Sequence, residues 1–250
     1  MSTATRPGRA LAWWQLLRAA NVFTAASNVI AGFLIVRGEW TPAKTLALLI
    51  GSSACLYLAG MVLNDVYDAE LDALERPERP IPAGHISRTT ASSAGWALLT
   101  SGVLLAWLAA VTAGNPMPGL LAVLLAFAIV RYDKVLKSTW AGPMAMGWCR
   151  VLNVLLGASI AGDLLRQPWA LAYAVLIGMY TVMITIVARS ETIGEWSQKL
   201  HVRNVVTRML QGFIVLDAAA ATLAAGWPSG LAVLALLVPT VFIARRAPMT

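Results

Sequence analysis

The chain alternates long apolar stretches with short charged ones, and this alternation constrains its fold more than any other feature. A helix needs about 20 apolar residues to cross a bilayer. The chain is 58% hydrophobic and only 12% charged, far from the balance of soluble domains. We therefore predict an all-α integral membrane protein, a polytopic bundle of about eight transmembrane helices forming one domain over residues 1–250. The apolar stretches lie near residues 13–37, 43–63, 89–113, 117–131, 140–161, 168–189, 205–226 and 230–244.

Positive side chains gather on one side of this predicted bundle. If both termini and the loops after the second, fourth and sixth stretches share one side, the other side holds only Arg37, Lys44 and Arg166. The positive-inside bias then makes the richer side, with the N-terminus, cytoplasmic. We expect a bacterial inner (plasma) membrane. Nucleic acid is excluded as a partner, because the basic residues are spread over several loops instead of one patch.

Acidic side chains end the second apolar stretch, in Asn64-Asp65-x-x-Asp68-x-x-x-Asp72. A helical backbone stacks Asp65, Asp68 and Asp72 on one face, with Asn64 beside Asp68. Close carboxylates repel one another unless cations lie between them. Oxygen-only ligands of this kind favour Mg²⁺, which shares itself with substrate phosphates. The spacing predicts a magnesium site at this helix end, although a solvated helix end between two spans is the structural alternative.

A second acidic pair, Glu191 and Glu195, follows the sixth stretch on the same side. Four residues apart, the two side chains share a face if the helix continues. Together with the first motif they could hold Mg²⁺ ions on either side of one diphosphate, where a metal acts as a Lewis acid on the leaving group. The alternative is surface pairing with Arg189, Lys199 and Arg203.

Cationic groups suited to the same anion lie between the acidic elements. Arg76 and Arg79 stand in a proline-rich loop, and Lys134 and Lys137 follow the fourth stretch. The guanidinium groups can bind phosphate oxygens, although these cations also serve as topology determinants. The face of Tyr132 could lie against a developing carbocation.

Polar residues inside the apolar stretches form a third set of candidates. Arg150 and Asn153 lie one turn apart in the fifth stretch. Such residues are costly in a membrane and face a cavity or a partner, so they either line a cavity or form an interhelical hydrogen bond. The sequence assigns no role to Asp217, in the seventh stretch.

The motif from Asn64 to Asp72, followed by Arg76-Pro-Glu-Arg79-Pro-Ile-Pro-Ala-Gly84, resembles the first Asp-rich signature of the UbiA superfamily of intramembrane prenyltransferases. Tyr132 with Lys137 is similar to the Tyr/Lys element after the family's fourth helix. The resemblance runs through most of the chain. The Met-Gly-Trp-Cys-Arg-Val-Leu-Asn segment and the Ser-Glu pair resemble the EboC-like branch, which occurs in bacterial clusters.

The resemblance implies a bundle, usually of nine helices, around a central cavity that opens sideways to membrane lipid. A polyprenyl tail would enter from the bilayer, Mg²⁺ would hold its diphosphate, and ionisation would give an allylic cation captured by a small acceptor, aromatic or otherwise. The resemblance implies Asn64, Asp65, Asp68 and Asp72 as the first metal site, Arg79 and Lys137 on the diphosphate and Asn21 in the cavity lining. With the residue patterns above, the predicted metal ligands are Asn64, Asp65, Asp68, Asp72, Glu191 and Glu195. The predicted catalytic residues are Asp65, Asp68, Tyr132 and Glu191, and the predicted binding residues are Asn21, Asn64, Arg76, Arg79, Lys134, Lys137, Arg150 and Asn153.

The chain departs from the family in using Glu191 and Glu195 where aspartates are typical, and in having about eight predicted helices. Longer side chains at the second motif either shift the metal geometry or mark a changed chemistry. The leading hypothesis is therefore a Mg²⁺-dependent prenyltransferase that uses an isoprenyl diphosphate donor. The alternatives are non-catalytic binding or transport of a lipid-like or aromatic metabolite through the same cavity, and transfer from a sugar diphosphate to a lipid phosphate.

Overall fold

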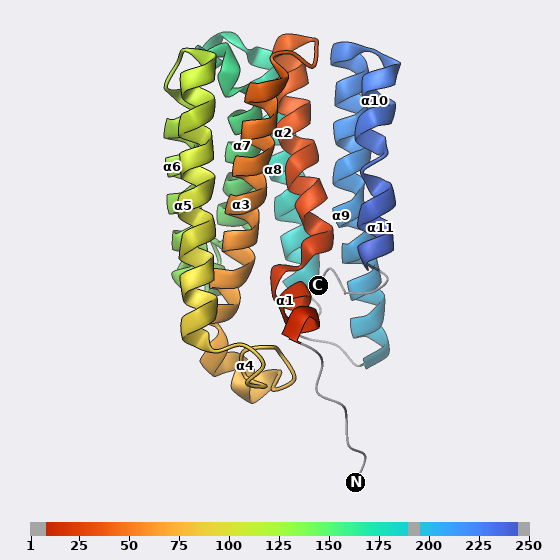
Figure 1. The fold of residues 1–250 in the computed structure, drawn as a ribbon. Coiled ribbons are helices and arrows are strands. Elements are labelled where there is room, and N and C mark those ends of the chain that lie inside the picture. Colours follow the sequence, from red (N-terminus) through yellow and green to blue (C-terminus); the bar gives the residue numbers. More distant parts are fainter. Residues whose placement is uncertain (1–8, 190–195, 245–250) are drawn as a thin grey trace.

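The computed structural model describes residues 9–189 and 196–244, with the backbone alone for residues 9 and 196–201. The described part is an up-and-down bundle of helices (Figure 1). Its α-helices are α1 (Arg9–Leu17), α2 (Val22–Arg37), α3 (Ala43–Tyr67), α4 (Ala69–Glu75), α5 (Arg88–Ala113), α6 (Met117–Lys134), α7 (Gly142–Ala158), α8 (Pro168–Arg189), α9 (Trp196–Ala225), α10 (Trp227–Leu234) and α11 (Leu237–Ala244). Short 3₁₀ helices are η1 (Ala19–Asn21), η2 (Leu136–Ser138), η3 (Ser159–Ala161) and η4 (Leu164–Arg166).

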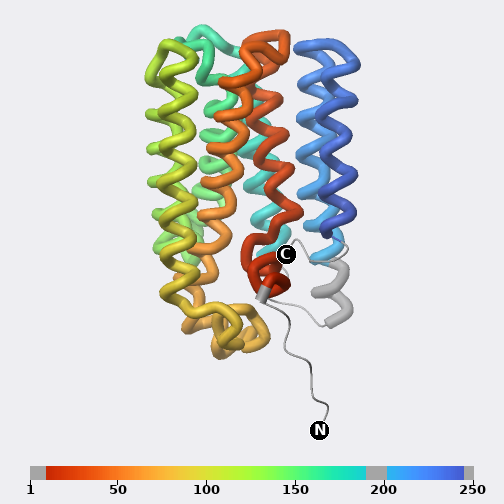
Figure 2. Tube along the Cα trace, in the orientation of Figure 1, coloured from red at the N-terminus to blue at the C-terminus, as the bar shows by residue number. Residues whose placement is uncertain are grey.

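The predicted bundle of about eight membrane helices is confirmed. Within the described residues, seven segments are long and apolar enough to cross a membrane. The tube in Figure 2 shows α6 running alongside them as a further antiparallel rod. The last turn of α6 carries Arg131, Asp133 and Lys134, which lower its hydropathy and set it apart from the other seven.

The first predicted span, 13–37, is not one continuous helix. It breaks at Arg18, whose backbone is left-handed with φ 44° and ψ 48°, a region that residues with a Cβ rarely adopt. The Arg18 side chain reaches an Asp65 oxygen at 3.0 Å, and this ion pair accompanies the turn. As a result α1 is a short separate helix at the end of the bundle, and α2 alone crosses it (Figure 1).

The last predicted span, 230–244, is also broken. It divides into α10 and α11 at residues 235–236. Pro239 explains the break, because its ring has no N–H for the carbonyl of Ala235 and would clash with it in a regular helix. The two short helices still continue in one direction along α9 (Figure 2).

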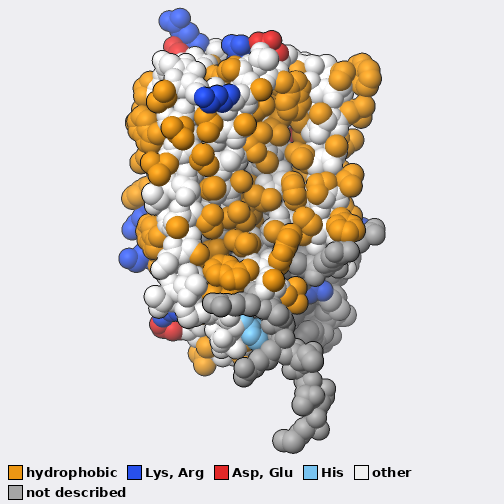
Figure 3. All heavy atoms as spheres, viewed as in Figure 1, with side chains coloured by type: hydrophobic (Ala, Val, Ile, Leu, Met, Phe, Trp, Pro, Cys, Tyr) orange, Lys and Arg blue, Asp and Glu red, His pale blue; other side chains and the backbone are white. Residues whose placement is uncertain are grey.

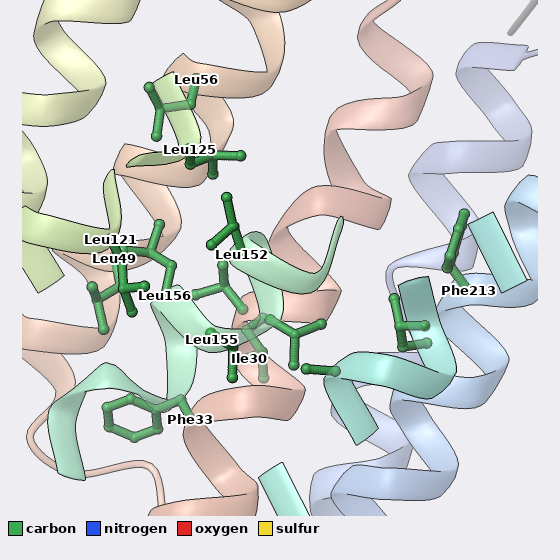
Figure 4. Close-up of a cluster of buried hydrophobic side chains, with 14 of the residues drawn as sticks. Ile30, Phe33, Leu49, Leu56, Leu121, Leu125, Leu152, Leu155, Leu156 and Phe213 are labelled. Carbon is green, nitrogen blue, oxygen red and sulfur yellow. The ribbon is translucent and has the colours of Figure 1, made fainter. Parts of the chain in front are cut away.

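The core sits around α2, the most buried of the spans, which packs against α3, α7 and α9. Gly32 on α2 and Gly157 on α7 face one another's helices so closely that a Cβ at either would overlap the opposite backbone. Small residues allow this close approach between membrane helices. Figure 4 shows the apolar core beside this contact, where Phe33, Leu49 and Leu156 are fully buried.

The outer surface suits a bilayer. Apolar side chains cover the middle of the molecule and charged ones gather toward its two ends (Figure 3). Exposed tryptophans stand near span ends, with Trp140 just before α7, Trp169 in the first turn of α8 and Trp227 at the start of α10. Aromatic side chains favour this level of a membrane.

Candidate functional site

The acidic motif lies where α3 passes into α4, at the lower end of the bundle in Figure 1. The helix is interrupted at Asp68, since α3 ends at Tyr67 and α4 begins at Ala69, but two helical hydrogen bonds remain: the Asp68 N–H donates to the Asn64 carbonyl and the Asp72 N–H to the Asp68 carbonyl, at 3.0 and 2.8 Å. Asn64, Asp65 and Asp68 therefore keep the predicted spacing at the end of α3, and Asp72 belongs to the first turn of α4. Asp65 and Asp72 are buried, each 5% exposed, whereas Asp68 is half-buried.

Two arginines neutralise the buried carboxylates. Arg18 Nη2 lies 3.0 Å from Asp65 Oδ1, and Arg79 Nη1 lies 2.6 Å from Asp72 Oδ2 and 3.6 Å from Asp65 Oδ1. Burial acts to lower the pKa of the Arg79 guanidinium, but the Asp65 and Asp72 carboxylates raise it above its ordinary value. Arg79 therefore carries its charge throughout the physiological range. Arg79 stands in the proline-rich loop between α4 and α5.

Lys137 brings a third cation to the same cluster from η2. Its Nζ lies 2.6 Å from Asp68 Oδ1 and donates to Asn64 Oδ1 at 3.1 Å. The end of α8 holds η2 in place, since Arg189 Nη2 donates to the carbonyls of Lys137 and Thr139 at 2.7 and 2.9 Å. The ends of α3, α6 and α8, far apart in sequence, therefore meet at this cluster.

A cavity of about 560 Å³, counting its open mouth, lies next to the cluster inside the bundle. It is formed between α2, α3, α6 and α7, and its wall includes Gly60 and Met61, one turn before Asn64. Its lining is mostly apolar. The polar members are Ser53, Tyr57, Tyr132, Asp133, Arg150 and Asn153.

Arg150 and Asn153 satisfy both of the roles that the sequence left open. Asn153 Oδ1 accepts a hydrogen bond from Ser53 on α3 at 2.6 Å, and Arg150 donates to Thr24 on α2 at 3.0 Å. The Arg150 guanidinium also lies over the Phe213 ring, 4.6 Å from its centroid, a favourable cation–π distance. These interhelical contacts hold both side chains in the cavity wall.

Asp217, which the sequence left without a role, is fully buried on α9. Its carboxylate accepts hydrogen bonds from Ser27 at 2.6 Å, from Asn28 at 2.8 and 3.0 Å, and from Tyr173 at 2.6 Å. Asn28 in turn accepts from Arg150 at 2.9 Å. Asn28 thus connects the buried acid to the guanidinium, and the network joins α9 to α2, α7 and α8.

Some predicted residues lie away from the cluster. Arg76 and Lys134 are exposed, so proximity in sequence did not bring them to the carboxylates. Asn21 is buried at the end of η1, and Ala25, one turn further on, is the residue that lines the cavity. The predicted second metal pair, Glu191 and Glu195, lies outside the described residues.

Besides the apolar lining and Cys149, four polar or charged residues at the cluster and cavity were not among the predicted site residues: Arg18, Ser53, Tyr57 and Asp133. Two of them left a signal, because Arg18 interrupts the first apolar stretch and Asp133 is a charge directly beside Tyr132. Ser53 and Tyr57 have ordinary membrane-helix surroundings in sequence and left none.

The donor set of the cluster fits Mg²⁺ bound together with a phosphorylated ligand. In the part of the chain that the structure describes, no group of three or more His, Cys, Asp or Glu side chains is arranged to hold a metal ion. Asn64 Nδ2 donates to Asp65 Oδ1 at 3.5 Å and to Asp68 Oδ2 at 3.2 Å, which places two carboxylate oxygens beside one amide group. Mg²⁺ is usually bound through one or two carboxylates plus waters and substrate phosphates, and does not need a complete protein cage.

Comparison with known proteins identifies the relatives of this chain. The model of the UbiA prenyltransferase family matches residues 25–247. The digeranylgeranylglyceryl phosphate synthase of Ignicoccus hospitalis is 31% identical over 185 residues, which are 72% of this chain and 58% of that protein. The chloroplastic chlorophyll synthase of Arabidopsis thaliana is 32% identical over 118 residues, 44% of this chain and 30% of that one. The match thus spans little more than half of the archaeal relative's length.

Solved structures share the fold. A digeranylgeranylglyceryl phosphate synthase structure has a TM-score of 0.59 at 18% identity, covering 95% of this chain and 85% of that chain. A UbiA homolog from Archaeoglobus fulgidus bound to DMAPP and Mg²⁺ has a TM-score of 0.56 at 17% identity, covering 94% and 88%. At such low identity the likeness establishes the arrangement of the helices alone.

Proposed function

The chain belongs to the UbiA prenyltransferase family, and from that premise we propose that it transfers a polyprenyl group from an isoprenyl diphosphate to a small acceptor within the membrane, with Mg²⁺ as cofactor. The observation that carries the proposal is the position of a dense ionic cluster beside a mostly apolar cavity. An isoprenyl diphosphate has the same division, with a charged head and an apolar tail.

The head would bind at the cluster. Arg79 and Lys137, like Arg18, are partly exposed while remaining in contact with the carboxylates, and we assign the phosphate oxygens to Arg79 and Lys137. Asn64, Asp65 and Asp68 would hold the metal. Bound Mg²⁺ would supply Lewis-acid neutralisation of the diphosphate leaving group. The ligand-free cluster is neutral, since Arg18, Arg79 and Lys137 balance the three aspartates, so the site is charge-compensated before any ligand arrives.

The reacting carbon would lie in the cavity. Tyr57 and Tyr132 line it, and aromatic faces attract positive charge, so the two rings suit an allylic cation. The apolar remainder of the wall would accept the tail and keep bulk water from the cation. Asn153 and Arg150, fixed by their hydrogen bonds to α3 and α2, would orient the acceptor.

We further propose that the cluster faces the cytoplasm. The α4 end of the bundle carries Arg18, Arg79 and Lys137, and positive side chains mark the inner side of membrane proteins. The bacterial plasma membrane stays a prediction, because the relatives reported above are archaeal and plant proteins.

Diphosphate release tests this proposal. The purified protein in lipid nanodiscs would be given geranylgeranyl diphosphate with Mg²⁺, and geranylgeranylglyceryl phosphate as acceptor, a choice suggested by the product named for the archaeal relatives. We expect prenylated product with matching diphosphate release, and a loss of about 10- to 100-fold in Asp68→Asn, the scale seen when the surroundings of a metal are disturbed. Asp163→Asn is the matched control, since Asp163 is exposed and pairs with Arg166 in the loop between α7 and α8.

The same assay can refute the proposal. A protein that binds the donor but releases no diphosphate with or without Mg²⁺ would favour the binding or transport alternative. Equal activity in Asp68→Asn and Asp163→Asn would remove the acidic cluster from the mechanism.

A further inference from the structure

Asp133, next to last in α6, is a buried carboxyl whose bonding is incomplete. The residue is 3% exposed and lines the cavity. Its Oδ2 atom is buried and has no hydrogen-bond partner among the described residues. An unsatisfied polar atom in a low-dielectric interior is costly. A group left in this state at a cavity wall is therefore suited to a partner that arrives with a ligand.

The other buried acids of the described chain show how unusual this is. Asp65 pairs with Arg18, Asp72 pairs with Arg79, and Asp217 accepts hydrogen bonds from three side chains. In each case the protein supplies the donors. At Asp133 Oδ2 the described residues supply none, although the residue itself lines the cavity.

We propose that Asp133 accepts a hydrogen bond from the hydroxyl group of the acceptor and takes up its proton during prenyl transfer, so that the acceptor is an alcohol. This inference rests on the proposed function and assigns to it a base and a class of acceptor. The placement supports both, because Asp133 is adjacent to Tyr132 in the cavity wall and four residues before Lys137 at the ionic cluster. Asp133 thus stands in the chain between Tyr132, assigned to the cation, and Lys137, assigned to the head.

The step balances without any further reactant. The C1–O bond of the isoprenyl diphosphate breaks and its electron pair leaves with the diphosphate. A lone pair of the acceptor oxygen forms the new bond to C1, and the hydroxyl proton passes to Asp133 Oδ2. The products are an ether, diphosphate and a neutral Asp133, which returns its proton to water when the site opens.

The other polar groups of the cavity are poorer bases. Ser53 and Asn153 are hydrogen-bonded to one another, and Arg150 has only donor atoms. A neutral tyrosine hydroxyl is a weak proton acceptor, which sets aside Tyr57 and Tyr132. Asp133 is therefore the cavity-lining group best able to receive a proton.

The test compares two acceptors in wild-type protein and in Asp133→Asn. The first acceptor is geranylgeranylglyceryl phosphate, and the second is its analogue with a thiol in place of the free hydroxyl. A thiol has a pKa of about 8.5 and ionises without help, whereas an alcohol does not. General bases contribute about 10²- to 10⁴-fold, so we expect Asp133→Asn to lower the kcat for the alcohol by at least about 100-fold. The loss for the thiol should be at least about tenfold smaller.

Asp163→Asn again controls for the loss of a carboxylate elsewhere. Equal losses for alcohol and thiol in Asp133→Asn would mean that Asp133 only shapes the cavity, and no loss for either would mean that the proton goes to the diphosphate. Either result overturns this inference and leaves the proposed function standing. A wild-type protein that releases diphosphate but prenylates neither acceptor overturns the assignment to alcohols. A wild-type protein that releases none overturns both proposals.

Discussion

The Asp217 network gives the sharpest stability prediction. Its carboxylate, 0% exposed, is the shared acceptor for Ser27 and Asn28 on α2 and for Tyr173 on α8. Asp217→Ala removes that acceptor and leaves three donors facing a methyl group. Because Asp217 stands on α9, the substitution removes these contacts of α9 with α2 and α8, whereas the Tyr180 hydroxyl of α8 still donates to the Met209 carbonyl of α9 at 2.8 Å.

The magnitude follows from the number of donors. A side-chain hydrogen bond inside a membrane protein contributes about 0.6 kcal/mol on average and about 1.7 kcal/mol at most. Three orphaned donors therefore cost roughly 2 to 5 kcal/mol. At about 2–4 °C per kcal/mol for a chain of this size, a loss of about 3 kcal/mol lowers Tm by roughly 6 to 12 °C. Asp217→Asn should cost less than half as much, because the Ser27 and Tyr173 hydroxyls can rotate to suit an amide.

Thermal unfolding in one detergent, followed by tryptophan fluorescence, measures these differences. Thr185→Val is the matched control, since the hydroxyl donates to the Thr181 carbonyl of its own helix at 2.9 Å and its loss should change Tm by no more than about 2 °C. If Asp217→Ala unfolds within that margin of wild type, the network does not hold α9. If the Ala and Asn variants lose the same amount, hydrogen bonding is not the cause.

Two further predictions compare neighbours that differ in their contacts. Arg79→Gln should lower turnover by roughly 10- to 100-fold, because a hydrogen bond to a charged group contributes about 1.5–3 kcal/mol. Arg76→Gln, at an exposed position, should stay within about twofold of wild type. Steady-state diphosphate release measures both, and equal losses would contradict a role for the Arg79 ion pairs in turnover. Lys137→Met should raise the KM for the donor by at least about tenfold. Lys134 is exposed, so Lys134→Met should leave that KM nearly unchanged. Equal KM values in the two variants would place the diphosphate away from Lys137.

Features set by local spacing could be predicted from the sequence. The apolar stretches predicted the spans because helix length and bilayer thickness are directly related. Asn64, Asp65 and Asp68 keep their predicted helical spacing at the end of α3. Each of these depends on a short segment whose geometry follows from its own residues.

Features that depend on distant partners could not be predicted. Arg18 and Asp65 are 47 residues apart in the chain, and no periodicity in either segment indicates the ion pair or the break of the first span that accompanies it. Asp217 contacts residues about 190 positions away on α2. The unpaired oxygen of Asp133 is a property of its surroundings, so a single sequence cannot reveal it.

The charged residues of this bundle differ in how the protein compensates them, and the difference separates structure from chemistry. At the α4 end, cations and carboxylates balance one another near the surface, where ligands can replace either partner. Around Asp217, every carboxylate hydrogen bond comes from within the protein, and such a closed network has no vacancy for a ligand. Asp133 belongs to neither arrangement. Since a bilayer penalises ionisable groups strongly, the Asp133 oxygen that lacks a partner among the described residues is the one for which the proposed transfer step would supply a partner.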